Sequence, residues 1–152
     1  MLFRQPENYP FKLSKSLISM LLRLRNTSTI IAKPIALSAA ATGVLVLGTL
    51  HTRSAAQTAL RVESMFPADV RDAVRAQFAD AVTGIFAQRL LPRVGGGRAA
   101  AFEVLRAVPA VRNIVRNGQY GQLSSVMMSG AEQGMQTSEM AEAMLRSKGI
   151  IV

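Results

Sequence analysis

The sequence has no cysteine and only one histidine, His51, among its 152 residues. Without cysteine, the chain has no disulfide framework, no thiolate metal site and no cysteine nucleophile. One histidine and nine acidic side chains form no cluster of two histidines and a carboxylate, so the sequence predicts no bound metal ion. Aromatic residues make up only 5% of the chain and form no stacking series, which argues against nucleic acid as a partner.

Acidic residues are scarcest at the start of the chain. Before Glu63 the only acid is Glu7, against eight lysines and arginines. Acids and bases nearly balance after that point, so the net charge of +9 is mostly an N-terminal property. A basic charge confined to one end does not predict a globular nucleic-acid-binding protein.

The sequence predicts two parts, a basic N-terminal extension at residues 1–33 and one folded region at residues 34–152. A hydrophobic content of 49% is enough for a single core. Within the extension, Phe11–Arg25 mixes basic residues with leucine, isoleucine and methionine. Three interpretations fit it: a basic amphipathic helix on a membrane, a targeting presequence, or a partly ordered extension that covers an apolar surface.

The uncharged run Ile35–Leu50 is shorter than the roughly 20 residues that a membrane-spanning helix requires. Its composition changes at Gly43, which favours two secondary-structure elements over a single membrane-spanning helix. Ala-rich Ile35–Ala41 predicts a helix with Pro34 in its first turn, and Val44–Leu50 predicts a buried strand that ends near His51.

Residues 53–152 predict a mainly helical region with one hairpin. The predicted helices are Ser54–Phe66, a helix whose periodicity runs from Asp69 to Ile85, Ala110–Asn117, Gln122–Met128 and Ser138–Lys148. Arg89–Pro92 and Arg98–Leu105 predict extended segments around the three glycines at 95–97. Ser129 and Glu132 have the spacing of a capping box.

Several segments occur together in an order that is typical of one protein family. They are ATGVLVLGTLHTRSAAQTALRVESMFP, FAQRLLPR, GRAAAFEVL, AVRNIVRNGQ and GMQTSEMAEAML. From about Ile35 onward, the chain resembles the C-terminal part of the type IV pilus retraction (twitching motility) ATPases, the PilT/PilU family of type II/IV secretion NTPases. The resemblance implies an α/β fold: the C-terminal portion of a RecA-like P-loop ATPase domain, with an incomplete sheet and a mostly helical C-terminal subdomain.

The resemblance also implies roles for particular residues. GTLHT looks like the family's His box, so His51 would be a sensor on the phosphate side of an ATP site, flanked by the nucleotide-binding residues Thr49 and Thr52. The segment at 110–115 looks like the family's motor-output motif, whose members here are Val111, Arg112, Asn113 and Ile114.

The family works as a hexameric ring in the bacterial cytoplasm, peripheral to the inner membrane. The resemblance therefore implies pilus motor ATPase subunits and the inner-membrane pilus platform as partners, and ATP with Mg²⁺ as the family's cofactors.

Departures from the family pattern concern ATP chemistry. The sequence contains no GxxxxGK[ST] motif, which would hold the phosphates. Ile31 stands where the resemblance places the Walker B glutamate, and Ala41 and Val44 replace the family's usual Glu and His. We therefore expect no tight ATP binding and no hydrolysis by this chain alone.

Three functional hypotheses follow. The first is a truncated retraction ATPase-like protein that is inactive alone. The second is a non-catalytic interaction module that docks on full-length motor subunits. The third is a small basic membrane-associated protein, which accounts for the first fifty residues but not for the later motifs.

Overall fold

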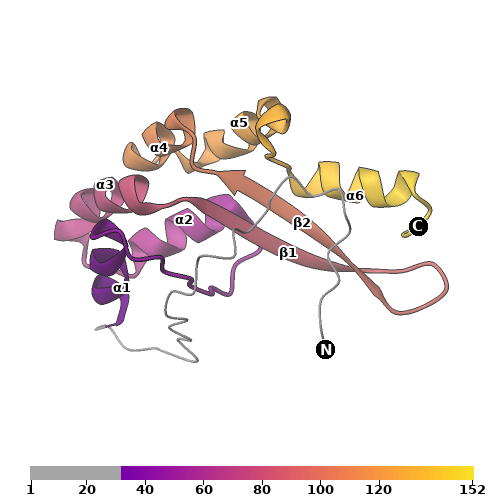
Figure 1. Ribbon diagram of the computed structural model, residues 1–152, viewed down its shortest axis with the longest axis horizontal. Coiled ribbons are helices and arrows are strands. Elements are labelled where there is room, and N and C mark those ends of the chain that lie inside the picture. The colour runs from indigo at the N-terminus through magenta and orange to yellow at the C-terminus, as the bar shows by residue number, and fades with distance from the viewer. Residues whose placement is uncertain (1–31) are drawn as a thin grey trace.

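The computed structural model describes residues 32–152, which form six α-helices, three short 3-10 helices and one two-stranded antiparallel sheet (Figure 1). The helices are α1 (Ala32–Ala41), α2 (Ala55–Ser64), η1 (Ala68–Val70), α3 (Arg71–Ala81), α4 (Pro109–Arg116), η2 (Tyr120–Gln122), α5 (Leu123–Ser129), η3 (Ala131–Gln133) and α6 (Ser138–Ser147), and the strands are β1 (Gly84–Pro92) and β2 (Arg98–Arg106). The basic segment Phe11–Arg25 lies outside the described residues.

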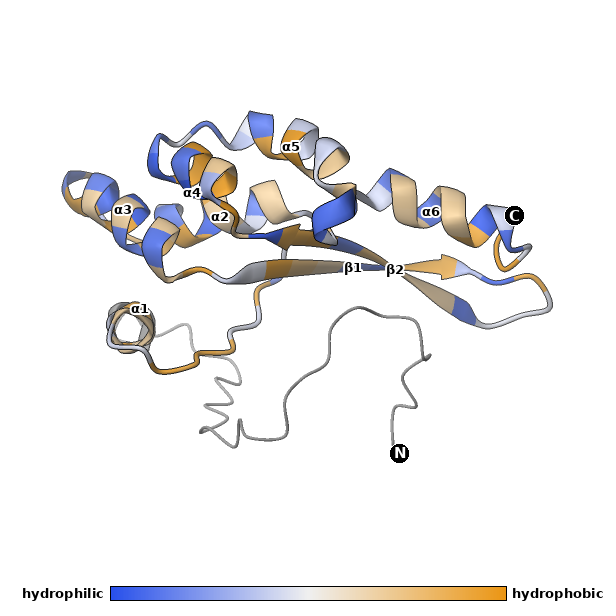
Figure 2. Cartoon of the chain, turned by 45° about the horizontal axis from the view of Figure 1, so that its top comes forward, coloured by the Kyte–Doolittle hydropathy of each residue, from blue (hydrophilic) through white to orange (hydrophobic). Residues whose placement is uncertain are grey.

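The hairpin of β1 and β2 has two faces of different character. Its register pairs Ile85 with Leu105 and Ala87 with Glu103, and all four of these residues are buried. The alternate residues of the two strands point to the opposite, outer face, because side chains alternate along a strand. In Figure 2 the helices α2 to α6 lie on one side of the hairpin, and α1 lies beyond the end of the hairpin, where it contacts α3.

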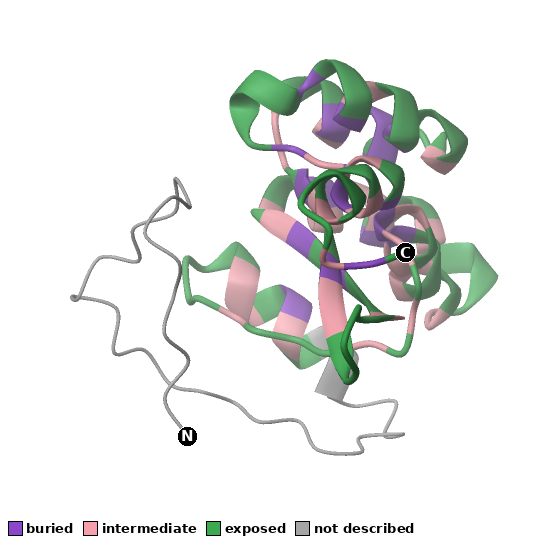
Figure 3. Ribbon diagram, turned by 90° about the vertical axis from the view of Figure 1, so that its right-hand side faces the viewer, coloured by how far each residue is buried: buried purple, intermediate pink, exposed green. Residues whose placement is uncertain are grey.

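The hydrophobic core lies between the inner face of the hairpin and the helices α2 to α5. Its largest fully buried side chains are Leu105 from β2, Val111 and Val115 from α4, and Leu123 from α5. Figure 3 shows buried positions concentrated where the helices meet the hairpin. The residues that fix the position of α4 are therefore the same ones that build the core.

The structure confirms most of the predicted elements. Helices occur at Ala32–Ala41, Ala55–Ser64, Pro109–Arg116, Leu123–Ser129 and Ser138–Ser147, close to the ranges that the sequence predicts. The hairpin turns at the three glycines 95–97, all with positive φ, a backbone region that glycine enters without steric strain.

The predicted strand at Val44–Leu50 is wrong. Residues 44–50 form no strand, and Val44, Leu45 and Leu47 are exposed. A strand needs a neighbouring strand to pair its backbone groups, and within residues 32–152 the only sheet is the hairpin itself. No helix of this part of the chain is long and apolar enough to cross a membrane.

Two smaller predictions are also wrong. The periodicity that runs to Ile85 overextends α3, which ends at Ala81 because Val82 is already extended (φ −64°, ψ 134°); Ile85 belongs to β1. The expected capping box does not form, because the Ser129 hydroxyl donates to the carbonyls of Ser125 and Val126 within its own helix.

A leucine-to-alanine substitution should have a large effect on one face of the hairpin and a small effect on the other. Leu105→Ala should destabilise the chain by roughly 2–5 kcal/mol, because Leu105 is fully buried and truncation leaves a cavity. Leu90→Ala is the matched control on the outer face, where Leu90 is 53% exposed, and should change stability by less than about 0.5 kcal/mol. Urea unfolding followed by circular dichroism measures both, and equal losses would contradict this assignment of faces.

Candidate functional site

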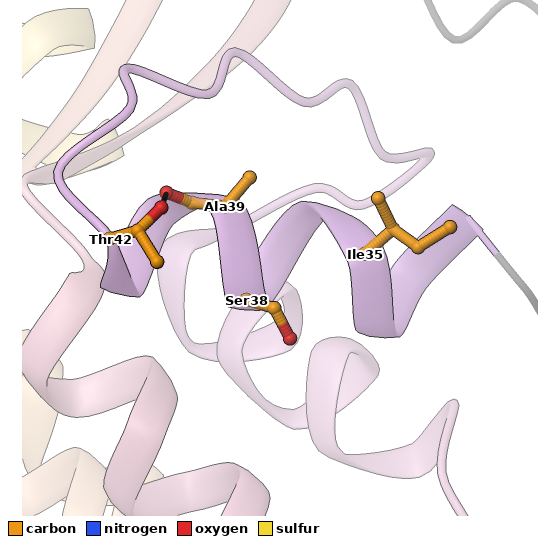
Figure 4. A pocket seen from close by; sticks show the side chains of 4 residues that line it. All are labelled: Ile35, Ser38, Ala39 and Thr42. Atoms are coloured by element: carbon orange, nitrogen blue, oxygen red, sulfur yellow. Dashed lines mark hydrogen bonds between the residues drawn. The ribbon is translucent and has the colours of Figure 1, made fainter.

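The single histidine lies in the connection between α1 and α2. His51 and Thr49 are exposed, and Thr52 is half-buried. This places the three candidate nucleotide-binding residues together on one surface segment, but not at the end of a strand as the sequence predicts. A broad apolar depression lies beside α1, lined by Ile35 and Thr42 among others (Figure 4), and it includes none of these three residues.

The residues just after His51 are tied to the first turn of α2. Thr58 Oγ1 donates to the carbonyl of Ser54 (2.8 Å), so the hydroxyl of Thr52 is the donor in the 2.7 Å contact between Thr52 and Thr58. The side chain of Ser54 caps the helix by accepting from the backbone N–H of Gln57 (3.2 Å), which satisfies one of the free N–H groups at the helix start. His51 therefore precedes a stretch with a defined conformation.

A buried carboxylate fixes the start of this same helix. Glu103 on β2 is only 6% exposed. One of its oxygens accepts from the backbone N–H of Ala55 (2.6 Å), and the other accepts from the hydroxyl of Ser138 (2.8 Å). Ala55 and Ser138 are the first residues of α2 and α6, so two helix N-termini face one negative charge, an arrangement that stabilises it.

Sequence reasoning missed Glu103. The signal was present, because an acid at position 103 falls on the inward-facing phase of a strand whose other inward positions are Ala101 and Leu105. An acid at such a position must find partners.

The expected motor-output motif forms most of α4. Val111 and Ile114 are buried in the core. Arg112 reaches across to the end of α3 and donates to the carbonyls of Ala79 and Asp80. The C-terminal end of a helix is partially negative, so a cation in this place is favourable. Asn113 is exposed and accepts from the side chain of Asn117 (3.2 Å).

A second polar cluster holds the loop after α4 against α2 and α3. Arg75 donates to Glu63 (2.8 Å), and the Tyr120 hydroxyl donates to the other oxygen of Glu63 (2.5 Å). Burial and the hydrogen bond to Glu63 raise the pKa of Tyr120 far above its usual value. Burial alone would lower the pKa of Arg75, but the hydrogen bond and charge of Glu63 outweigh it, so the pKa is raised.

The His51 segment and the α4 motif belong to the same folded region but do not bond to each other. No hydrogen bond or ion pair links the two among the described residues, and no group of three or more acids and histidines in residues 32–152 could hold a metal ion. His51 and Thr49 are exposed on their segment, whereas the hydroxyl of Thr52 is engaged with Thr58.

The family model of the type II/IV secretion system protein matches residues 20–147. The chain is 43% identical over 117 residues to the type IV pilus retraction ATPase PilT of Pseudomonas aeruginosa, which covers 77% of this chain and 34% of that protein. It is 42% identical over 118 residues to the twitching motility protein of Neisseria gonorrhoeae, which covers 77% of this chain and 32% of the relative.

A crystal structure of the pilus retraction motor PilT with bound ADP resembles the fold with a TM-score of 0.70 and 39% identity. The match covers 78% of this chain and 33% of that structure. It confirms the predicted fold class, a partial α/β ATPase domain. The chain spans about a third of the length of the relatives that it matches.

Arg112 gives a direct test of how α4 is held. Arg112→Ala should lower the free energy of unfolding by roughly 1.5–3 kcal/mol, because two charge-assisted hydrogen bonds to α3 are lost. Asn113→Ala is the neighbouring control and should stay within about 0.5 kcal/mol of the parent chain. Denaturant titration compares the two, and an Arg112→Ala variant as stable as Asn113→Ala would show that the contact with α3 contributes nothing.

The raised pKa of Tyr120 predicts that the folded chain loses stability at high pH. Its neutral form is favoured in the folded state, so the stability that it contributes is present below about pH 10 and is lost as the pH rises above that value. Absorbance at 295 nm should show one tyrosine of the folded chain ionising well above pH 10, and Tyr120→Phe should remove that step. An unchanged titration curve in Tyr120→Phe would contradict the assignment.

Proposed function

This chain belongs to the type II/IV secretion system protein family, and we propose that it acts in type IV pilus retraction as a partner of full-length retraction ATPase subunits. The proposal combines two earlier hypotheses: an ATPase-like protein that is inactive alone, and an interaction module. The matched third of the relatives includes both the segment of His51 and the helix of Arg112.

The case against independent hydrolysis rests on phosphate binding. Phosphoryl transfer needs a phosphate cradle, a neutralising cation and a bound Mg²⁺, and the sequence contains no GxxxxGK[ST] motif. His51, Thr49 and Thr52 lie on an exposed segment. They would contact a nucleotide that the full-length subunits hold, with His51 as the sensor and Thr49 and Thr52 as its flanking residues. This chain alone would bind neither ATP nor Mg²⁺ tightly.

The observation that carries the proposal is the outer face of the hairpin. Phe86 is 63% exposed, Leu90 53% and Phe102 38%, and the register places all three on the same face. Exposed apolar side chains that gather on one face are typical of an interaction site. We propose that it binds motor ATPase subunits of the hexameric ring, on the cytoplasmic side of the inner membrane near the pilus platform.

Mixing the purified chain with full-length PilT of Pseudomonas aeruginosa tests the proposal. Light scattering after gel filtration should show a complex at micromolar concentrations. The chain alone should release phosphate from ATP no faster than background. Failure to associate, or hydrolysis above background that His51→Ala abolishes, would each overturn it.

A pair of variants identifies the face involved. Phe86→Asp should weaken the complex by about tenfold or more, because a charge enters the centre of an apolar contact. Met128→Asp is the matched control, since Met128 is 57% exposed on α5, on the helix-covered side. Equal affinities of the two variants would exclude the outer face as the binding surface.

A further inference from the structure

Glu103 touches the starts of two helices that are far apart in sequence. Ala55 begins α2 and lies four residues after His51, and Ser138 begins α6 near the C-terminus. We propose that Glu103 is a positioning residue that couples the His51 segment to α6 through these two hydrogen bonds. The proposal does not depend on ATP or on a pilus partner, so it stands or falls separately from the function proposed above.

The first half of the coupling runs from His51 to Glu103. Thr52 is hydrogen-bonded to Thr58, and Thr58 is hydrogen-bonded to the carbonyl of Ser54. Ala55 follows directly and donates its backbone N–H to Glu103. A displacement of the segment that carries His51 therefore pulls on the contact between Ala55 and the buried carboxylate.

The second half runs from Glu103 into α6. Ser138 donates its hydroxyl to the second carboxylate oxygen. The preceding residues are fixed to the same strand, because Gln136 and Val104 exchange two backbone hydrogen bonds of 2.8 and 2.9 Å. Thr137 caps the helix by accepting from the backbone N–H of Met140. The start of α6 is thus held beside Glu103 by contacts that survive if the Ser138 bond is lost.

Burial makes the two bonds to Glu103 interdependent. A carboxylate that is 6% exposed cannot replace a lost partner with bulk water without moving, and an unpaired buried charge is strongly unfavourable. Loss of one bond therefore shifts the carboxylate and weakens the other. This mutual dependence distinguishes a coupling element from two separate anchors, and only a measurement at the far partner reports it.

Hydrogen exchange of backbone amides in the full chain tests the coupling. Ser138→Ala should speed exchange at residues 52–58 by about three- to tenfold, although the Ser138 hydroxyl is bonded to Glu103 and not to any of them. Ser147→Ala is the matched control on the same helix, because Ser147 Oγ only donates to the carbonyl of Met144 (2.9 Å). It should leave exchange at residues 52–58 unchanged.

Two substitutions of Glu103 complete the test. Glu103→Gln keeps the shape and can still accept from Ala55 while donating to Ser138 Oγ, so exchange at residues 52–58 should stay near that of the parent chain or rise less than in Glu103→Ala. Glu103→Ala should speed exchange both at residues 52–58 and at the start of α6. If Ser138→Ala changes exchange only within α6, the two hydrogen bonds of Glu103 act independently and the proposal is overturned.

Discussion

The pairing of β1 with β2 is the constraint on which the remaining structure depends. Its register places Ile85, Leu105 and Glu103 on one face and Phe86 and Phe102 on the other. A slip of β2 by one residue along β1 would turn the side chains of β2 to the opposite face, and would bury Phe102 while exposing Glu103. The core, the anchor of α2 and α6, and the apolar outer face are therefore three consequences of one hydrogen-bonded ladder.

Polar groups at helix ends then set how the helices sit on this ladder. The carboxylate of Glu103 faces the N-termini of α2 and α6, and Arg112 faces the C-terminal carbonyls of α3. Each charge has the sign that the helix dipole favours at that terminus. The apolar core supplies most of the stabilisation in such a domain, but it is non-directional. The charged contacts at helix termini add a directional component to the packing of the core.

The sequence predicts the elements whose signals are local, and misses those that depend on distant neighbours. The turn at the glycines 95–97 and the helix at Pro109–Arg116 follow from residue types within a few positions of each other. The segment Val44–Leu50 has the composition of a buried strand, yet composition cannot supply a pairing partner, and the described residues contain none for it. The alternation along β2 marks Glu103 as inward-facing, but its partners could not be identified from the sequence, because they lie 48 and 35 residues away. The location of His51 beside Thr49 and Thr52 was readable from the sequence, whereas its exposure was not.

The combination of an exposed histidine and a firmly held helix start has a mechanical consequence. The sensor role that we propose for His51 requires a limited position, because a side chain on a freely moving segment contacts a phosphate at random. His51 is itself exposed, but the residues that follow it are fixed to α2, and α2 is fixed to the hairpin through Glu103. One end of the segment is therefore anchored and the other, toward α1, is exposed over Val44–Leu47. Because Leu47 lies only four residues before His51, a surface that packs on these exposed apolar side chains would lie close to His51 along the chain.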